Sequence, residues 1–513
     1  MLFNSIEFLV FFLPITIGVF HLLRCYCPAA SNYWLAIASL IFYGWWEPRY
    51  LVLLLASALV NYLLGLALAE TRADKNRVSN ILFAIGLSFN VGLLAYYKYA
   101  AFLLANVAKL FAVDLPEPTI ILPLAISFFT FQQIAYLSDV HSERKAEQSF
   151  WRYLLFVTFF PQLIAGPIVH HKEMLPQFRR TSELFSARLI APAITLIVLG
   201  LAKKVLLADS LALFASPGFT VAEQYQYLSS SEAWLSITAY TLQLYFDFSG
   251  YCDIALGCAL LIGIRLPINF ASPYQSASII DFWRRWHITL SRFMRDYVYI
   301  PLGGNRKGQS RWLRNLFATT AVSGLWHGAG WTFIFWGCLH GLMLMGNHLW
   351  RRTSLQIRLQ EHKSWWFLSV GITFIAVLLA WVYFRSADLA SAHYFFSSLF
   401  SSAPQSSQSS YLALFTQSTR NTLFQPAVQE MGFWTVAGLL LLPCLFIVFA
   451  LPNTLRIVGQ EKWGFEPLRG DMAKHWIKVR WQPTSVWAIG LGLLLWMVLI
   501  SLSAVSPFLY FQF

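Results

Sequence analysis

Apolar segments long enough to cross a bilayer recur along the whole chain, and they constrain the fold more than any other feature of the sequence. About 20 consecutive apolar residues span the hydrocarbon core as a helix. Many windows approach this length, from 8–23 near the start to 486–505 near the end. Hydrophobic residues make up 57% of the chain and charged residues only 12%, where soluble domains carry about 25% charged residues. The sequence therefore predicts an all-α polytopic membrane protein embedded in a lipid bilayer.

Basic residues gather in the short loops between these segments and predict the topology. Such loops face the cytoplasm, so we place loops 71–77 and 141–145 there, and the N-terminus and the corner 45–49 outside. The N-terminus has no basic region before its first apolar segment, and no small-residue cleavage site accompanies that segment. We therefore predict a retained helix rather than a signal peptide. The net charge of +13 fits basic loops that meet anionic lipid better than nucleic-acid binding.

One apolar segment, 153–169, has basic residues on both sides and contains Pro161, Gly166 and Pro167. Proline interrupts a helix, and irregular backbone at membrane depth needs protein or a water-filled cavity around it. We therefore predict a re-entrant element that lines a central cavity.

Polar segments are few, and none predicts a separate domain. The serine-rich stretch within 397–430 is nearly uncharged and low in complexity, which predicts a flexible outer loop. The six cysteines lie mostly in apolar segments and lack the paired spacing of a zinc site, so we expect no bound metal. We find no clear internal repeat, which would have favoured a transporter.

The most charged stretch, 281–330, combines a basic surface with a histidine in an apolar run. It contains only two acidic residues, Asp281 and Asp296, and eight basic ones: Arg284, Arg285, Arg292, Arg295, Arg306, Lys307, Arg311 and Arg314. The chain then turns apolar, and His327 lies between Trp326 and Gly328. This order indicates a site at which an anionic ligand meets a proton acceptor.

His327 is the first candidate for a catalytic residue. A neutral imidazole with an ordinary pKa of about 6.5 can accept a proton near neutral pH, which suits a general base. An ionisable residue within the membrane is a functional hypothesis by default. A structural histidine, hydrogen-bonded between helices, remains the alternative.

His287 lies among cations and flat rings. Helical spacing predicts that Asp281, Arg284, Arg285 and Ile288 share one side. Arginine forks and the ring of Trp283 suit a ligand with phosphates and a purine, such as a coenzyme. An amphipathic helix bound to lipid head groups explains the same pattern equally well.

Two further groups of polar residues lie in or near apolar segments. Asp247 and Asp253, with Gln243, could orient an imidazole or pair with an arginine, although structural ion pairs are favoured. His340 follows His327 by 13 residues, nearly the same face of a continuous helix, but the intervening glycines make that continuity doubtful.

Several motifs resemble the membrane-bound O-acyltransferase family, most closely its bacterial branch with the alginate O-acetyltransferase membrane subunit. The resemblance covers essentially the whole chain and is carried by these segments: 2–9, 164–167, the Tyr-Phe-Asp-Phe-Ser-Gly of 245–250, the Trp-Arg-Arg-Trp-His block within 281–291, the Leu-Trp-His-Gly of 325–328 and 508–513.

The resemblance implies a single domain over residues 1–513, with about eleven or more helices and re-entrant segments around a central funnel. The catalytic motifs would lie at 120–350, between N-terminal helices at 1–110 and C-terminal helices at 365–513. His327 would be catalytic, with His287 essential at the cytosolic entrance. Acetyl-CoA would be the donor, and no cofactor would be permanently bound.

We expect Arg284, Arg285 and Arg292 to attract the phosphates, and Trp283, Trp326, Asp247 and Asp253 to contribute to substrate binding. A periplasmic acetyltransferase partner would complete transfer to an exported, alginate-like polysaccharide from the bacterial inner membrane. Peptidoglycan O-acetylation and D-alanyl transfer to teichoic acid remain open within the superfamily. A polysaccharide or lipid transporter and a non-catalytic scaffold are the alternatives outside it.

Overall fold

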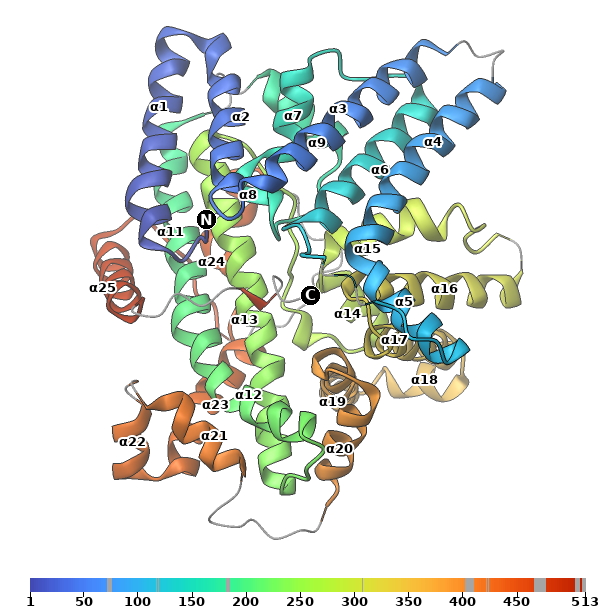
Figure 1. Ribbon diagram of the computed structural model, residues 1–513. Helices are drawn as coiled ribbons and strands as arrows, with labels where there is room; N and C mark the ends of the chain where they lie inside the picture. Colours follow the sequence, from blue (N-terminus) through green and yellow to red (C-terminus); the bar gives the residue numbers. More distant parts are fainter. Residues whose placement is uncertain are drawn as a thin grey trace.

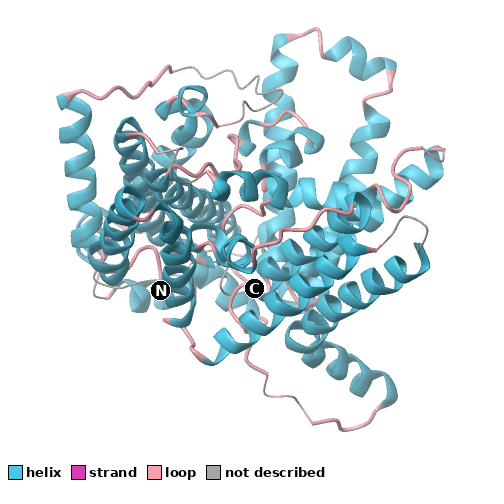
Figure 2. Ribbon diagram, turned by 90° about the horizontal axis from the view of Figure 1, so that it is seen from above, coloured by secondary structure: helices cyan, strands magenta, loops and turns pink. Residues whose placement is uncertain are grey.

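The computed structural model describes residues 1–71, 76–116, 118, 120–180, 185–306, 308–401, 410–420, 422, 424–465, 477–502 and 508–509. Across these residues the regular elements are helices, joined by turns and loops (Figure 1, Figure 2). The predicted all-α membrane class is therefore confirmed. The described chain has seven helical stretches long and apolar enough to cross a membrane: Glu7–Tyr26, Arg49–Glu70, Arg77–Phe111, Ala187–Glu223, Ser230–Ile262, Lys363–Arg385 and Phe433–Ala450.

Most of the N-terminal helices form a group in the upper part of Figure 1, whereas α5 lies lower in this view. In the group, α6 contacts both α3 and α4. Aromatic rings pack α2 against η1 and the segment around Phe160: the ring centroid of Phe42 lies 5.8 Å from that of Phe8 and 5.7 Å from that of Phe160. The elements of this group are η1 (Glu7–Phe12), α1 (Leu13–Tyr26), α2 (Pro28–Gly44), α3 (Arg49–Glu70), α4 (Asn76–Leu94), η2 (Ala95–Tyr99), α5 (Ala100–Phe111) and α6 (Ile126–Glu143).

The apolar segment predicted to be broken is indeed broken, and almost all of it is buried. It forms α7 (Phe150–Thr158), one turn of α8 (Phe160–Leu163) and an extended stretch before α9 (His171–Arg179). Side chains satisfy the backbone that the break releases. The N–H of Ala165 donates to the hydroxyl of Tyr251 (3.3 Å), and that of Ile168 donates to the hydroxyl of Thr289 (2.9 Å). Such partners are what irregular backbone requires inside a membrane protein.

The long central helix α13 (Ser230–Ile262) is almost entirely buried. A capping box between Ser229 and Glu232 starts it, and Gly263, at φ 89°, ends it. It packs against α11 (Ile190–Ala202), η4 (Lys203–Ala208) and α12 (Asp209–Glu223). A side chain at Gly200 would come within 2.6 Å of the carbonyl oxygen of Gly250. Small residues at this crossing let the two backbones approach closely, as is usual between membrane helices.

The charged stretch 281–330 and the residues on either side of it form two short helices and a helical hairpin. The two short helices are α14 (Ile279–Arg285) and α15 (Ile288–Met294), and the π-helical turn η6 (Arg295–Tyr299) follows them. The helix is interrupted between them at His287. The prediction that Ile288 shares one helix face with Asp281 and Arg284 is therefore wrong. The hairpin is α16 (Gln309–His327) and α17 (Trp331–Trp350), with Gly324 against Gly337 at the crossing.

The C-terminal part is also helical. The serine-rich stretch predicted to be a flexible loop lies mostly at 402–409, outside the described residues. Before it, α20 ends at Leu399, and after it, α21 begins at Ser410 and packs on α12. The remaining elements are η3 (Ala187–Leu189), η5 (Pro273–Gln275), α18 (Ser354–Leu359), α19 (Lys363–Arg385), α20 (Leu389–Leu399), α21 (Ser410–Thr419), α22 (Phe424–Met431), α23 (Phe433–Ala450), α24 (Thr454–Val458), η7 (Gln460–Trp463) and α25 (Ser485–Ser501).

Candidate active site

Two histidines predicted from sequence lie side by side in the interior. The ring centroids of His287 and His327 are 6.4 Å apart, and the two residues are only 0% and 4% exposed. His287 lies at the break between α14 and α15, and His327 is the last residue of α16. The structure thus brings together two imidazoles that are 40 positions apart in the sequence.

Asn269 fixes the ring of His287. Its side-chain oxygen accepts from the main-chain N–H (3.2 Å) and the hydroxyl (3.0 Å) of Thr289 and lies 3.2 Å from His287 Nδ1. A main-chain N–H only donates, so the Asn269 atom must be the carbonyl oxygen, and Nδ1 must carry the proton. In the neutral ring, Nε2 then keeps its lone pair and can accept a proton. His287 itself has φ 45°, a region that residues other than glycine rarely adopt and that is often found at functional sites.

His327 lies at a helix end that is held by side chains of another element. Gly328 follows in an extended conformation (φ −161°) and does not cap α16. The ammonium group of Lys98 donates to the carbonyl oxygens of Trp326 (2.7 Å) and His327 (3.0 Å). The hydroxyl of Tyr99 donates to the carbonyl oxygen of Leu325 (2.8 Å). Three carbonyls that a helix end leaves without partners are therefore satisfied from η2.

Aromatic side chains close the space on the other side of His327. Trp336 and Phe384 lie 5.2 Å and 5.1 Å from its ring. Trp336 separates it from His340, whose Nδ1 accepts from the indole N–H of Trp283 (3.2 Å). We call Trp336 and Phe384 the aromatic wall; they cover one side of the His327 ring, and His327 also lines a cavity.

The cavity that His327 lines has a volume of about 330 Å³, and we call it the Lys98 cavity. Its lining is mostly apolar. The polar groups are those of Trp46, Lys98, Ser127, Trp326 and His327; the other lining residues are Ile121, Leu122, Pro123, Leu124, Ala125, Ile126, Phe128 and Ile164. The His327 side of the pair is therefore accessible to a small group that enters near Trp46.

A second cavity, of about 470 Å³, lies at the other end of α6; we call it the Lys172 cavity. Ser127 lines the Lys98 cavity and Asp139 lines the Lys172 cavity. These two residues are 12 positions apart on α6, which corresponds to about 18 Å along the helix axis. The lining of the Lys172 cavity is polar and charged: Ser138, Asp139, Ser142, His170, Lys172, Glu173, Arg292, Asp296, Tyr297 and Pro301.

A column of four stacked or tilted rings separates the two cavities. Tyr297 lies 4.9 Å from Phe293, Phe293 lies 4.2 Å from Phe131, and Phe131 lies 5.4 Å from Trp326. We call these four residues the aromatic column. Tyr297 lines the Lys172 cavity and Trp326 lines the Lys98 cavity, so the aromatic column extends from the lining of one cavity to the lining of the other.

The three arginines predicted to attract phosphates do not gather at one place. Arg292 lines the Lys172 cavity, where a bidentate pair joins it to Glu173 (2.6 and 3.0 Å). Arg285 is buried and pairs with Asp281 (3.0 Å). Arg284 is exposed and lies near His348 of α17. Of the three, only Arg292 is placed to meet a ligand in a described cavity.

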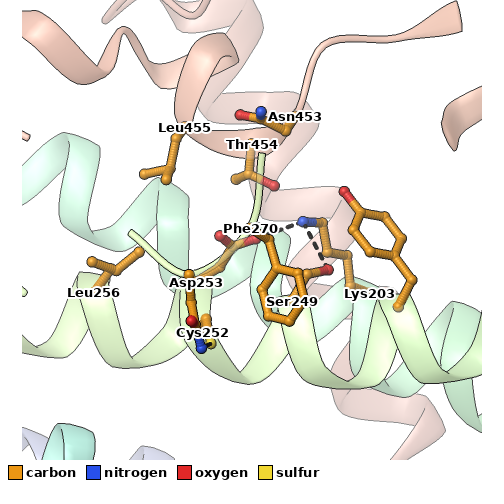
Figure 3. Close-up of a pocket in the computed structure, with 11 residues that line it drawn as sticks. Lys203, Ser249, Cys252, Asp253, Leu256, Phe270, Asn453, Thr454 and Leu455 are labelled. Atoms are coloured by element: carbon orange, nitrogen blue, oxygen red, sulfur yellow. Dashed lines mark hydrogen bonds and ion pairs between the residues drawn. The ribbon is translucent and has the colours of Figure 1, made fainter. Parts of the chain in front are cut away.

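The aspartates form structural ion pairs, the alternative favoured from sequence. Asp253 pairs with Lys203 (2.7 Å) beside Ser249 (Figure 3). Asp247 pairs with Lys204 (2.8 Å), which also reaches Asp209 (2.8 Å). Neither carboxylate contacts His287 or His327 in the described chain. Trp283, expected to stack on a coenzyme, instead donates to His340 inside the aromatic wall, whereas Trp326 does line a cavity.

Lys98 and Asn269 are the site residues that sequence reasoning missed. Lys98 carried a usable signal, because a lysine inside an apolar stretch such as Arg77–Phe111 marks a functional hypothesis. Asn269 carried none, since a single asparagine in a loop after a helix is common.

Comparison with known proteins places this site in a family. The model of the membrane-bound O-acyltransferase family matches residues 142–393, which include both histidines. A peptidoglycan O-acetyltransferase of Helicobacter pylori is 43% identical over 420 residues, covering 76% of this chain and 78% of the relative. The chain belongs to the membrane-bound O-acyltransferase family.

Other relatives of this membrane-bound O-acyltransferase differ in the names they carry. A probable alginate O-acetylase AlgI of Pseudomonas putida is 38% identical over 406 residues, covering 78% of this chain and 80% of the relative. A teichoic acid D-alanyltransferase of Streptococcus thermophilus is 30% identical over 282 residues, 51% of this chain and 68% of the relative. The chain is thus an acyltransferase whose similarity is higher to these two O-acetylating relatives than to the D-alanyl one.

Proposed function

We propose that this membrane-bound O-acyltransferase moves acetyl groups from cytoplasmic acetyl-CoA to an acceptor on the outer side of the bacterial inner membrane. The observation that carries the proposal is the position of the two histidines, between a charged cavity and a mostly apolar one. The Lys172 cavity lies beside the basic segment 141–145, which the positive-inside rule assigns to the cytoplasm. It would receive the phosphates of the donor, and Lys172 and Arg292 are its basic residues.

The proposed chemistry uses His327 as the general base. An acceptor hydroxyl is a poor nucleophile at neutral pH and needs an adjacent base. His327 removes its proton while the hydroxyl oxygen forms a bond to the acetyl carbon. The carbon–sulfur bond breaks, and the proton passes to the sulfur, so that coenzyme A leaves as the thiol. His287, with Nδ1 fixed by Asn269, orients the thioester end. This step is direct transfer. The alternative is a transient acyl-enzyme, in which an enzyme nucleophile first displaces coenzyme A from the acetyl carbon and the acceptor hydroxyl then displaces that nucleophile.

We further propose that the acetyl groups serve O-acetylation of an exported, alginate-like polysaccharide through a periplasmic partner. The AlgI relatives support this acceptor. The 43% identity to a peptidoglycan O-acetyltransferase supports peptidoglycan as the second candidate. Acetate content of exopolysaccharide and of peptidoglycan, measured in cells with and without the gene, distinguishes the two.

The test of the proposed activity uses purified protein in nanodiscs with radiolabelled acetyl-CoA and a membrane and periplasmic extract as acceptor. We expect His327→Ala to lower turnover by about 100-fold or more, because general bases contribute about 10²–10⁴-fold. His393→Ala, on the exposed side of α20, is the matched control and should turn over like the wild type. Equal turnover in the His327→Ala variant would contradict the proposal and favour a transporter or scaffold.

A further inference from the structure

The end of α16 at His327 depends on a residue outside the matched family region. Lys98 belongs to η2, the π-helical turn between α4 and α5, and lies 229 positions before His327. Turns of this kind interrupt α-helices and are frequent at functional sites. Here the turn places two neighbouring residues, Lys98 and Tyr99, against the same helix end.

Lys98 makes three polar contacts there. Besides the carbonyl oxygens of Trp326 and His327, it reaches the hydroxyl of Ser127 at 3.4 Å. An ammonium group has three N–H donors and no acceptor, so these contacts use its full capacity. Among the described residues no carboxylate pairs with Lys98 within 4.0 Å, and its partners are the negative end of the α16 dipole.

The position of these contacts connects them with the chemistry. Lys98 and His327 line the same cavity, and the carbonyl that Lys98 holds belongs to His327 itself. After His327 the chain turns through Gly328 and Gly330, which offer little restraint of their own. Without Lys98, the carbonyl oxygens of Trp326 and His327 would lose these two hydrogen bonds, while the one from Tyr99 to Leu325 would remain.

We propose that Lys98 is a positioning residue of the acyl transfer, which holds the backbone of Trp326 and His327 so that the imidazole faces the Lys98 cavity. The inference rests on the proposed function. A misplacement of about 1 Å of a reacting group can lower a rate by about 100-fold. The effect falls on kcat, because Lys98 lies across the aromatic column from the Lys172 cavity, where the donor would bind.

The test compares four variants in the nanodisc assay. Lys98→Met keeps the length of the side chain but loses its donors, and we expect kcat to fall about tenfold or more with the KM for acetyl-CoA unchanged. Lys98→Arg keeps donors and should recover most of the rate. Tyr99→Phe removes one neighbouring donor and should lose about threefold. Lys109→Met, an exposed lysine on α5, makes the same substitution away from the site and should behave as the wild type.

The outcomes separate this inference from the proposed function. A wild type without histidine-dependent turnover would overturn both. An active wild type with an unchanged kcat in Lys98→Met, or with Lys98→Arg no better than Lys98→Met, would overturn the positioning role alone. Should Lys98→Met fail to fold, as judged by gel filtration, the pair Lys98→Arg and Tyr99→Phe decides: a Tyr99→Phe kcat equal to that of the wild type would overturn the role.

Discussion

Asn269 shows how much of the site depends on a single residue. Its side chain joins His287 to Thr289, and Thr289 in turn holds the extended stretch after α8 through Ile168. The tautomer of a catalytic imidazole is set by the hydrogen bond made by its other nitrogen. Asn269 therefore decides which nitrogen of His287 carries the proton.

We predict that Asn269→Ala lowers kcat by about tenfold to 100-fold, because His287 loses the partner that fixes its tautomer and orientation. The measurement is acetyl transfer by folded protein, normalised to the gel-filtration peak. Asn305→Ala, at an exposed turn, is the control and should keep the wild-type rate. A fully active Asn269→Ala variant would show that the ring of His287 needs no such restraint.

Among the elements, the hairpin of α16 and α17 has no room for a larger residue at its crossing. A Cβ at Gly324 would lie 2.3 Å from the carbonyl oxygen of Phe333 and 2.9 Å from Cα of Gly337. We predict that Gly324→Ala destabilises the protein by about 1–3 kcal/mol through overpacking and lowers activity, since α16 carries His327. Thermal unfolding in detergent measures the first effect and acetyl transfer the second.

Gly346, on α17, provides the matched control for this prediction. Nothing lies within 4 Å of a Cβ placed there, so Gly346→Ala should stabilise the helix by about 0.5–1 kcal/mol. If both alanine variants melt at the same temperature, the close crossing at Gly324 is not a determinant of stability.

A buried carboxylate ties α7 to α9. Glu147 accepts from Arg152 (2.8 Å) and Arg179 (2.8 Å). Burial raises the pKa of Glu147, but the hydrogen bonds from the two arginines outweigh it, and the net shift is downward from 4.5. A lowered folded-state pKa means stability that is present above about pH 4.5 and is lost as the pH falls through the folded-state value.

We therefore predict that Glu147→Gln lowers the melting temperature at pH 7, and that its difference from the wild type shrinks as the pH falls below about 4.5. Glu430→Gln, at an exposed position on α22, should show no difference at either pH. A difference that stayed constant down to about pH 3 would mean that the charge of Glu147 does not contribute.

For the whole molecule, the sequence predicted the membrane class, the broken segment after α7 and the two histidines. These follow from local signals: apolar length, Pro161 with Gly166, and an imidazole in an apolar run. It did not predict that the three arginines separate. The break at His287 re-aims the helix that carries Arg292, and Arg284 and Arg285, as neighbours on α14, point about 100° apart. The sequence reasoning also missed Lys98, despite the signal of a lysine in an apolar stretch, and Asn269, whose role arises only where distant segments meet. The described part of 397–430 folds because apolar rings such as Phe415 pack on Phe214 (4.9 Å).

The arrangement of the whole molecule fits the proposed transfer of acetyl groups across the membrane. The two cavities lie at opposite ends of α6, with the histidines and the aromatic column between them. A donor in one compartment and an acceptor in the other would then meet at His327 without either crossing the bilayer.

The most direct measurement encloses radiolabelled acetyl-CoA inside proteoliposomes and offers the acceptor extract only outside. We predict that label reaches the outer acceptor with the wild type and His393→Ala, and falls by about 100-fold with His327→Ala. Free acetyl-CoA in the outer medium is followed in the same samples to exclude leakage. Label that stays inside with an active wild type, or that crosses equally well with His327→Ala, would contradict transfer through the histidine site.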